Sequence, residues 1–265
     1  MDLLSLSFAG VTPHEYKVLA HHGNMGMTRR IREKVSRAGR MDRKRITGML
    51  KAKGIGHITM EDAAYPSLLK QIYDPPLVLY YRGDTSLLEN PMLGIVGSRK
   101  ATGYTRLVLQ NIIPDLGGMV VVSGLAYGAD DMAHNAAMTN GLGTVGVLAF
   151  GHDVHYPRST AGTRDRMERE GLVISEYPPD VQIAKWRFVA RNRIIAGLSS
   201  GVLVTEAEAS SGSLITLDMA LNENRNAYCI PGNIHAPQSA GTNERLREGA
   251  KMVLSGADIM EDFRS

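Results

Sequence analysis

Three short segments of the chain carry the kinds of side chain that hold phosphate groups. The first is Gly97-Ser98-Arg99-Lys100, which follows an apolar run and precedes a stretch of helical character. A serine hydroxyl can donate to a phosphate oxygen, and a guanidinium can bind phosphate with two parallel N–H groups. The same residues also suit an ordinary tight turn with a solvated arginine, so both interpretations stay open.

The second segment is Arg191-Asn192-Arg193, which follows Trp186 and Phe188. Two arginines, an amide and two aromatic rings favour a nucleic-acid surface, because bases of any kind can stack on such rings. The alternative is that the rings anchor the hydrophobic core while the arginines pair with carboxylates. For the rings we favour the core role.

The third segment is Ser211-Gly212-Ser213, which opens a helix predicted at Leu214–Asn224. Hydroxyl groups at a helix start satisfy unpaired backbone N–H groups, or leave those groups free for a phosphate. Capping alone explains these serines unless they lie beside Gly97–Arg99. Asn243, in Gly241-Thr242-Asn243, starts another helix, and an N-cap role is again the simpler interpretation.

The elements that must position these segments follow a regular pattern. Short apolar runs rich in β-branched residues, typical of strands buried on both faces, alternate with stretches long enough for helices, such as Ala129–Thr139. This alternation predicts an α/β fold with a doubly wound, mostly parallel sheet. The runs are Leu93–Val96, Met119–Val122, Thr144–Phe150, Leu172–Ser175, Gly201–Thr205 and Ala227–Ile230.

Ligands of such a sheet bind beyond the carboxyl ends of the strands. Gly97-Ser98-Arg99 follows the first run, and Ser123-Gly124 follows the second. Glu206 ends the fifth run, where we expect it to anchor Arg191 or Arg193 and not to perform acid–base chemistry. The sequence therefore predicts one site at this edge of the sheet.

Charge divides the chain into two parts. Residues 1–60 carry 12 Lys and Arg against 4 Asp and Glu, whereas residues 61–265 carry 18 against 23. The first part reads as short helices, and prolines at 66, 75 and 76 suit an extended connector after it. We expect a small basic helical domain at 1–60 and a Rossmann-like domain at 61–265. The basic residues between 29 and 45 either contact phosphate or form a solvated face.

Several classes of protein are disfavoured. No apolar run reaches the length of a membrane span, and the first ten residues lack the basic start of a signal peptide, so we expect a cytoplasmic protein. The chain has one cysteine, Cys229, no phosphate-binding P-loop and no paired histidines at zinc spacing. We expect no metal and no cofactor. His152 follows the third run, and we expect it to be an exposed loop residue.

A series of motifs, taken together, resembles one family. The strings are GIVGSRKAT (94–102), VVSGLAYGADDMAH (121–134), SEYPP (175–179), RNRIIAGLS (191–199), EAEASSGSLIT (206–216), IPGNI (230–234) and GTNERLREGAKMV (241–253). In this order they are similar to the DNA-processing protein A (DprA/Smf) family, over roughly residues 60–263. Four positions depart from the usual pattern: Tyr127 and Ser210 stand where basic residues are common, Val189 where proline is usual, and Ala129 where isoleucine is usual.

The resemblance implies an extended Rossmann-like fold and a nucleic-acid function. The family binds single-stranded DNA, protects it and helps load the RecA recombinase onto it during natural transformation, and its members form dimers. Its binding pocket maps onto Gly97, Ser98 and Arg99 and onto Arg191, Asn192 and Arg193. We expect the DNA contacts to come from Gly97, Ser98, Arg99, Lys100, Ser123, Gly124, Arg191, Asn192, Arg193, Ser211, Gly212, Ser213 and Asn243.

A rival interpretation comes from a different class. Related Rossmann-like folds include nucleotide-binding proteins and phosphoribohydrolases, in which Arg99, Glu206 and the serine turn would hold a small phosphorylated ligand. Such hydrolases need a catalytic carboxylate beside a Gly-Gly-x-Gly-Thr loop, and this chain has Ser211-Gly212-Ser213 there. We therefore expect a binding protein and not an enzyme.

Overall fold

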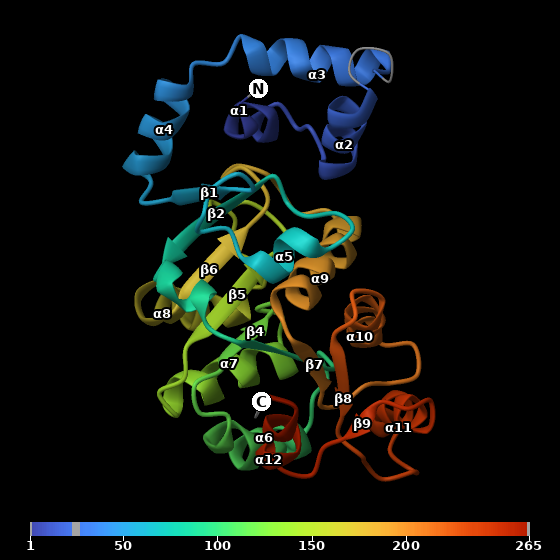
Figure 1. Ribbon diagram of the computed structural model, residues 1–265. Coiled ribbons are helices and arrows are strands. Elements are labelled where there is room, and N and C mark those ends of the chain that lie inside the picture. The colour runs from blue at the N-terminus through green and yellow to red at the C-terminus, as the bar shows by residue number, and fades with distance from the viewer. Residues whose placement is uncertain (1, 23–26, 264–265) are drawn as a thin grey trace.

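A single mixed sheet forms the centre of the computed structural model, which describes residues 2–22 and 27–263 (Figure 1). Within these residues nine strands pair in the order β1-β2-β6-β5-β4-β3-β7-β8-β9. Strands β3 to β9 are parallel, and β1 and β2 are antiparallel additions beside β6. The strands are β1 (Gly56–Thr59), β2 (Val78–Gly83), β3 (Met92–Val96), β4 (Val120–Ser123), β5 (Thr144–Leu148), β6 (Leu172–Ser175), β7 (Gly201–Val204), β8 (Asn226–Cys229) and β9 (Lys251–Met252).

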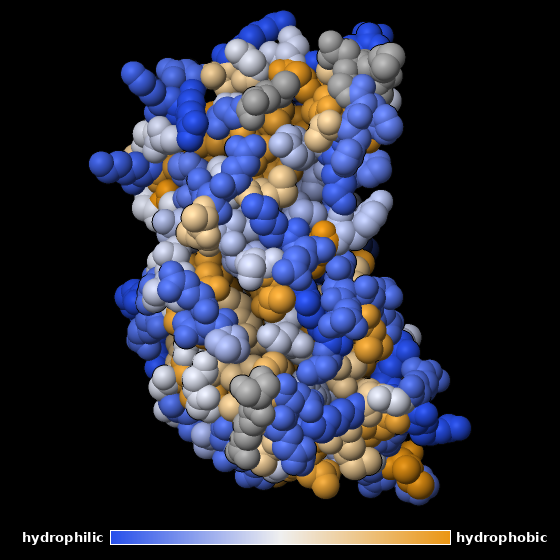
Figure 2. All heavy atoms as spheres, in the orientation of Figure 1, coloured by the Kyte–Doolittle hydropathy of each residue, from blue (hydrophilic) through white to orange (hydrophobic). Residues whose placement is uncertain are grey.

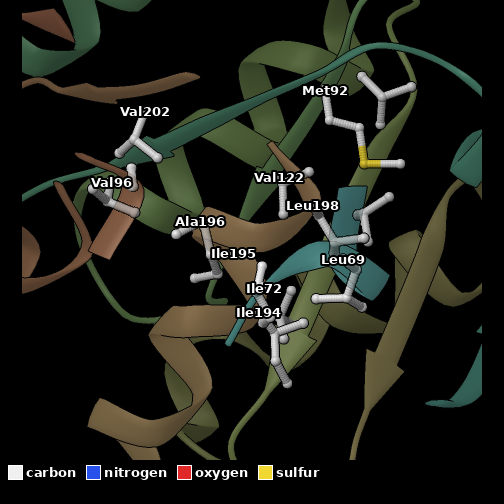
Figure 3. Packing of buried hydrophobic residues seen from close by; sticks show 14 of the residues in the cluster. Leu69, Ile72, Met92, Val96, Val122, Ile194, Ile195, Ala196, Leu198 and Val202 are labelled. Atoms are coloured by element: carbon white, nitrogen blue, oxygen red, sulfur yellow. The ribbon is translucent and has the colours of Figure 1, made fainter. Parts of the chain in front are cut away.

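Helices cover both faces of this sheet. On one face α6 and α7 pack against Leu93 and Val121, and on the other α5, α9 and α10 pack against Val96 and Val122 (Figure 3). Both faces of the inner strands are therefore buried, as the apolar runs predict. The helices after β1 are α5 (Ser67–Gln71), α6 (Gly103–Ile112), α7 (Ala129–Thr139), α8 (Ala161–Glu170), α9 (Lys185–Leu198), α10 (Gly212–Asn222), α11 (Ala240–Arg247) and α12 (Gly256–Met260).

The order of the strands fixes where a ligand can enter. From β3 the chain passes through α6 to β4 on one side, and after β6 it returns through α9 to β7 on the other side of β3. Neighbouring strands β3 and β7 thus send their connections to opposite faces of the sheet. A crevice opens between the carboxyl ends of two such strands, and this is where doubly wound sheets bind ligands.

Four helices precede the sheet in the described part of the chain: α1 (Leu3–Phe8), α2 (Pro13–His22), α3 (Arg29–Gly39) and α4 (Arg43–Ala52). The side chains of Asp2, Thr28 and Asp42 accept backbone N–H groups at the starts of α1, α3 and α4, as N-caps do. Leucines of α1 and α4 pack in one apolar cluster with Val78 and Tyr80 of β2. The helices and the sheet therefore share buried contacts.

The predicted fold class is confirmed. Each of the six apolar runs forms a strand within a residue or two of its expected ends, and α7 spans Ala129–Thr139 as predicted. Strands β1, β2 and β9 are not among the predicted runs. Strand β1 lies within residues 1–60 and pairs with β2, so the sheet begins before residue 60. Every helix in the described residues is too short or too polar to cross a lipid bilayer.

Candidate functional site

The turn after β3 lies at the crevice and is held there by tight contacts. The Ser98 N–H donates to the Glu206 carbonyl oxygen at 2.7 Å, which joins the ends of β3 and β7. A β-carbon on Gly97 would lie 2.5 Å from the Thr205 hydroxyl, so glycine is required. Gly128 has a φ of +90°, and a β-carbon there would lie 2.5 Å from the Ser98 carbonyl oxygen. These two glycines therefore let the turn after β3 approach both the end of β7 and the loop before α7.

Arg99 and Lys100 extend from this turn toward solvent. The Ser98 hydroxyl accepts the Lys100 N–H at 3.0 Å and so caps the turn. The Arg99 guanidinium lies 5.8 Å from the centre of the Phe188 ring, and within the described chain no carboxylate comes within ion-pair distance of it. Lys100 reaches Glu208 only at 3.8 Å, with both side chains exposed, which is a weak pair. Arg99 is therefore available to bind an anion.

Arg191 lies beneath the crevice and is 5% exposed. Its guanidinium donates to the carbonyl oxygens of Gly124 at 2.6 Å and Val147 at 2.5 Å, and its Nε donates to Asn192 at 3.2 Å. Burial lowers the pKa of Arg191 to about 10, although the nearby Asp130 carboxylate offsets part of this effect. At neutral pH the guanidinium therefore stays charged, and the Asp130 carboxylate beside it offsets part of that charge.

The opposite wall of the crevice is the start of α10. The Ser211 side chain caps the helix by accepting the Ser213 N–H, and the two hydroxyls lie 2.8 Å apart. A β-carbon on Gly212 would meet no atom within 4 Å, so this end of the helix is open. The free N–H groups of a helix start carry partial positive charge and favour an anion.

Together these elements enclose a cavity of about 400 Å³, which we name the strand-end pocket. Most of the predicted site residues line it, and Asp130, Phe188, Ser210 and Thr216 line it as well without having been predicted. The structure thus places the serine turn of α10 beside the turn after β3, as the sequence analysis required. The predicted residues in the pocket are Gly97, Ser98, Arg99, Lys100, Arg191, Asn192, Ser211, Gly212 and Ser213.

Four predicted residues do not line the strand-end pocket. Ser123 is fully buried and donates to the Ile95 carbonyl oxygen at 2.6 Å. Gly124 lines a smaller neighbouring pocket of about 140 Å³, which also contains Arg99 and Arg191. Asn243 exchanges two hydrogen bonds with the backbone of Gly232, at 3.0 and 3.1 Å. Arg193 lies on another face of α9, where it pairs with Glu176.

The predicted partner of the arginines is wrong. Glu206 accepts hydrogen bonds from the Thr102 N–H and from the hydroxyls of Thr102 and Thr105, at 2.7 to 2.8 Å. Arg193 pairs instead with Glu176, at 2.6 and 2.8 Å. Burial lowers the pKa of Arg193, but the Glu176 hydrogen bonds outweigh it and hold that pKa above its usual range. The two threonines lie about a hundred residues before Glu206, so no local pattern could pair them with it.

Two further expectations are corrected. His152 is buried, not exposed, and its Nε2 lies 3.0 Å from the Tyr80 carbonyl oxygen of β2, a strand that the sequence analysis did not identify. Trp186 is 60% exposed and is not a core anchor, whereas Phe188 packs edge-on against Phe150 and Tyr156. The helical period alone could not show that this end of α9 leaves the Trp186 ring exposed. Within the described residues no group of three His, Cys, Asp or Glu side chains comes together as a metal site.

Known proteins match this fold and this sequence over most of the chain. The sequence model of the family described as DNA recombination-mediator protein A matches residues 56–264. The DNA processing protein DprA of Bacillus subtilis is 39% identical over 222 residues, 83% of this chain and 75% of that protein. The DprA of Streptococcus pneumoniae is 44% identical over 203 residues, 76% of this chain and 72% of that protein.

Two solved structures are similar as well. The crystal structure of DprA from Streptococcus pneumoniae has a TM-score of 0.89 and 35% identity, and it covers 100% of this chain and 99% of its own. A structure described as showing the single-stranded DNA binding mode of DprA from Helicobacter pylori has a TM-score of 0.71 and 30% identity, with 78% of this chain and 95% of its own covered. On its motifs, its fold and these matches, the chain belongs to the DNA recombination-mediator protein A (DprA/Smf) family.

Proposed function

We propose that this protein binds single-stranded DNA in the strand-end pocket, protects it and helps load a RecA recombinase onto it during natural transformation. The observation that carries the proposal is the exposed Arg99 beside the open start of α10, above the buried charge of Arg191. These groups offer charge and N–H donors to a phosphate, while Phe188 and Arg99 offer flat faces to a base. The Helicobacter pylori relative is described as a single-stranded DNA binder.

Two departures from the family pattern replace basic residues at or beside this pocket. Ser210 lines it, and Tyr127, 61% exposed, lines the neighbouring pocket that Arg99 and Arg191 share. Replacing two basic residues removes two phosphate contacts, each worth about 0.7 in the slope of log K against log salt. We propose that Tyr127 offers a base a stacking face in place of that charge.

The remaining parts of the proposal concern assembly and organisation. We propose that the protein acts in the cytoplasm as a homodimer, without catalysis of its own, and that residues 1–60 form an accessory basic domain beside the Rossmann-like domain at 61–265. The two parts differ in charge: residues 1–60 carry 12 Lys and Arg against 4 Asp and Glu, whereas residues 61–265 carry 18 against 23. Light scattering of the purified protein would test the dimer.

A gel-shift titration with matched single- and double-stranded oligonucleotides at two salt concentrations tests the central claim. We expect tighter binding of the single strand, with affinity that falls as salt rises, because phosphate contacts release counterions. Equal affinity for both forms, or no binding at low salt, would contradict the proposal.

A further inference from the structure

A second, larger cavity lies between the N-terminal helices and the sheet. It has a volume of about 970 Å³, and we name it the N-terminal groove. Its walls combine the end of α1, one side of α3, the loop after β6 and the first turns of α9. In Figure 1 α1 and α3 belong to the blue helices above the sheet, and α9 lies below them. None of the residues that line this groove also lines the strand-end pocket.

Helix α9 separates the groove from the strand-end pocket. Trp186, Arg187, Ala190 and Arg193, spaced as one helix face, line the groove. Phe188, Val189, Arg191, Asn192 and Ile195 line the strand-end pocket from the other face. The first turns of α9 are therefore the shared wall of the two cavities.

The crest of this wall is apolar and exposed. Trp186 is 60% exposed, Val189 is 45% exposed, and Ile183, just before the helix, is 42% exposed. Figure 2 shows that hydrophobic residues also reach the surface between the hydrophilic ones. Trp186 and Val189 lie three residues apart on α9, beside the two cavities, and exposed apolar side chains grouped in this way mark a contact surface.

Trp186 is held in a defined orientation. The Arg187 guanidinium lies 5.1 Å from the centre of the Trp186 ring and 5.1 Å from the centre of the Tyr177 ring, so it is placed against both. Arg187 also donates to the Gln182 carbonyl oxygen. Cation–π contacts of this kind are attractive, so they favour this orientation of the ring. The exposed part of the indole can then stack on another planar ring.

The groove has an excess of free positive charge. Arg30, Arg37 and Arg187 line it, and no carboxylate within residues 2–22 and 27–263 pairs with any of them. Two of the three carboxylates in its lining, Asp74 and Glu176, are already paired with Arg193, which leaves Asp180. The charge of the groove thus complements a polyanion.

We propose that a single DNA strand in the strand-end pocket continues over the crest of α9, stacks a base on Trp186 and places its next phosphates in the N-terminal groove near Arg30 and Arg37. This proposal rests on the proposed single-strand binding and adds its path. The alternation of exposed rings with a cationic groove is how proteins hold single strands without reading sequence. A duplex, with its bases stacked inside, cannot make the Trp186 contact.

The tryptophan itself provides the test, because Trp186 is the only tryptophan of the chain. Thymidine oligonucleotides of increasing length are titrated into the full-length protein. Binding is followed by the anisotropy of a label on the DNA, and stacking by the fluorescence of Trp186. Short oligonucleotides should bind without quenching. Above a threshold length, quenching should appear together with tighter binding.

Three variants separate the possible outcomes. Trp186→Ala should weaken binding of long oligonucleotides by about 5- to 150-fold, the range for the loss of one base stack, and leave short ones unchanged. Trp186→Phe should retain most of the affinity. Leu221→Ala, which truncates a similarly exposed apolar residue on α10, is the matched control and should have no effect.

Failure of this path is distinguishable from failure of the proposed function. If long oligonucleotides bind tightly but never quench Trp186, and Trp186→Ala binds them as the unchanged protein does, the path over α9 is wrong while single-strand binding stands. If no oligonucleotide changes the anisotropy, the proposed function itself is wrong.

Discussion

The Arg191 guanidinium occupies the space that a side chain at residue 124 would need. A β-carbon built on Gly124 would lie 2.1 Å from Arg191 Nη1, and the same Nη1 donates to the Gly124 carbonyl oxygen at 2.6 Å. The glycine after β4 is therefore required by a buried charge from α9, not by its own backbone conformation. This contact ties the helix to the carboxyl edge of the sheet.

Gly124→Ala should destabilise the protein by about 1 to 3 kcal/mol, because the methyl group overpacks a site where a hydrogen-bonded guanidinium cannot move freely. Urea unfolding followed by circular dichroism measures this change. Gly103→Ala is the matched control, since a β-carbon there meets no atom within 4 Å. Equal stability of the two variants would refute the steric role of Arg191.

Arg99→Ala should weaken single-strand binding by about 1 to 3 kcal/mol, the range for removal of a charge-assisted hydrogen bond. Arg99 is exposed and pairs with no carboxylate of the described chain, so its removal should not disturb the fold. Anisotropy titration of a labelled oligonucleotide measures the effect. Arg169→Ala, which removes an exposed arginine from the last turn of α8, is the control. Unchanged affinity in a folded Arg99→Ala variant would remove the strand-end pocket from the proposal.

Neutralising Arg40, Lys44 and Arg45 together should flatten the salt dependence of single-strand binding. If these residues bind phosphates, the slope of log K against log salt should fall by about 0.7 for each phosphate that the protein no longer neutralises. Substitution is preferable to deletion of residues 1–60, because the deletion would also remove β1, which pairs with β2. An identical slope in the triple glutamine variant would show that the cluster is only a solvated face.

Acid should destabilise the fold through two buried histidines. Burial lowers the pKa of His152 to about 4 and that of His134 to about 3, against about 6.5 in the unfolded chain. The unfolded state therefore binds more protons as the pH falls from about 6.5 toward 4, and the fold loses stability over that range. Each histidine adds up to about 1.4 kcal/mol per pH unit to the slope.

His152→Gln tests this account. The glutamine amide can still donate to the Tyr80 carbonyl oxygen, as His152 Nε2 does, but it takes up no proton in this range. The free energy of unfolding, measured by urea at pH 5 and pH 7, should differ less in the variant than in the unchanged protein. An equal difference in both would show that His152 does not couple folding to pH.

The protein should produce no product from ATP, nucleoside monophosphates or single-stranded DNA. Both Glu206 carboxylate oxygens already accept hydrogen bonds from Thr102 and Thr105, so this group is held as an acceptor in a structural turn. Chromatography after prolonged incubation measures turnover. A product in stoichiometric excess that disappears in Glu206→Gln would favour the rival phosphoribohydrolase-like interpretation.

The sequence by itself determined the α/β alternation, six of the nine strands in the described residues and most of the chain segments that line the strand-end pocket. Runs such as Leu93–Val96 are apolar at nearly every position because inner strands are buried on both faces, and this pattern is local. The turn at Gly97–Arg99 was placed by the same rule, since ligands of a parallel sheet bind where its strands end. Local patterns and one topological rule were enough for these elements.

Only the tertiary structure decided which side chains meet. Arg193 pairs with Glu176 and Asp74, and Glu206 accepts from Thr102 and Thr105, because strand order brings distant residues together. Likewise β2 buries His152, and Trp186 lies exposed beside a groove that α9 lines together with N-terminal helices. A sequence pattern reports the face of an element, whereas a partner depends on which elements lie next to each other in space.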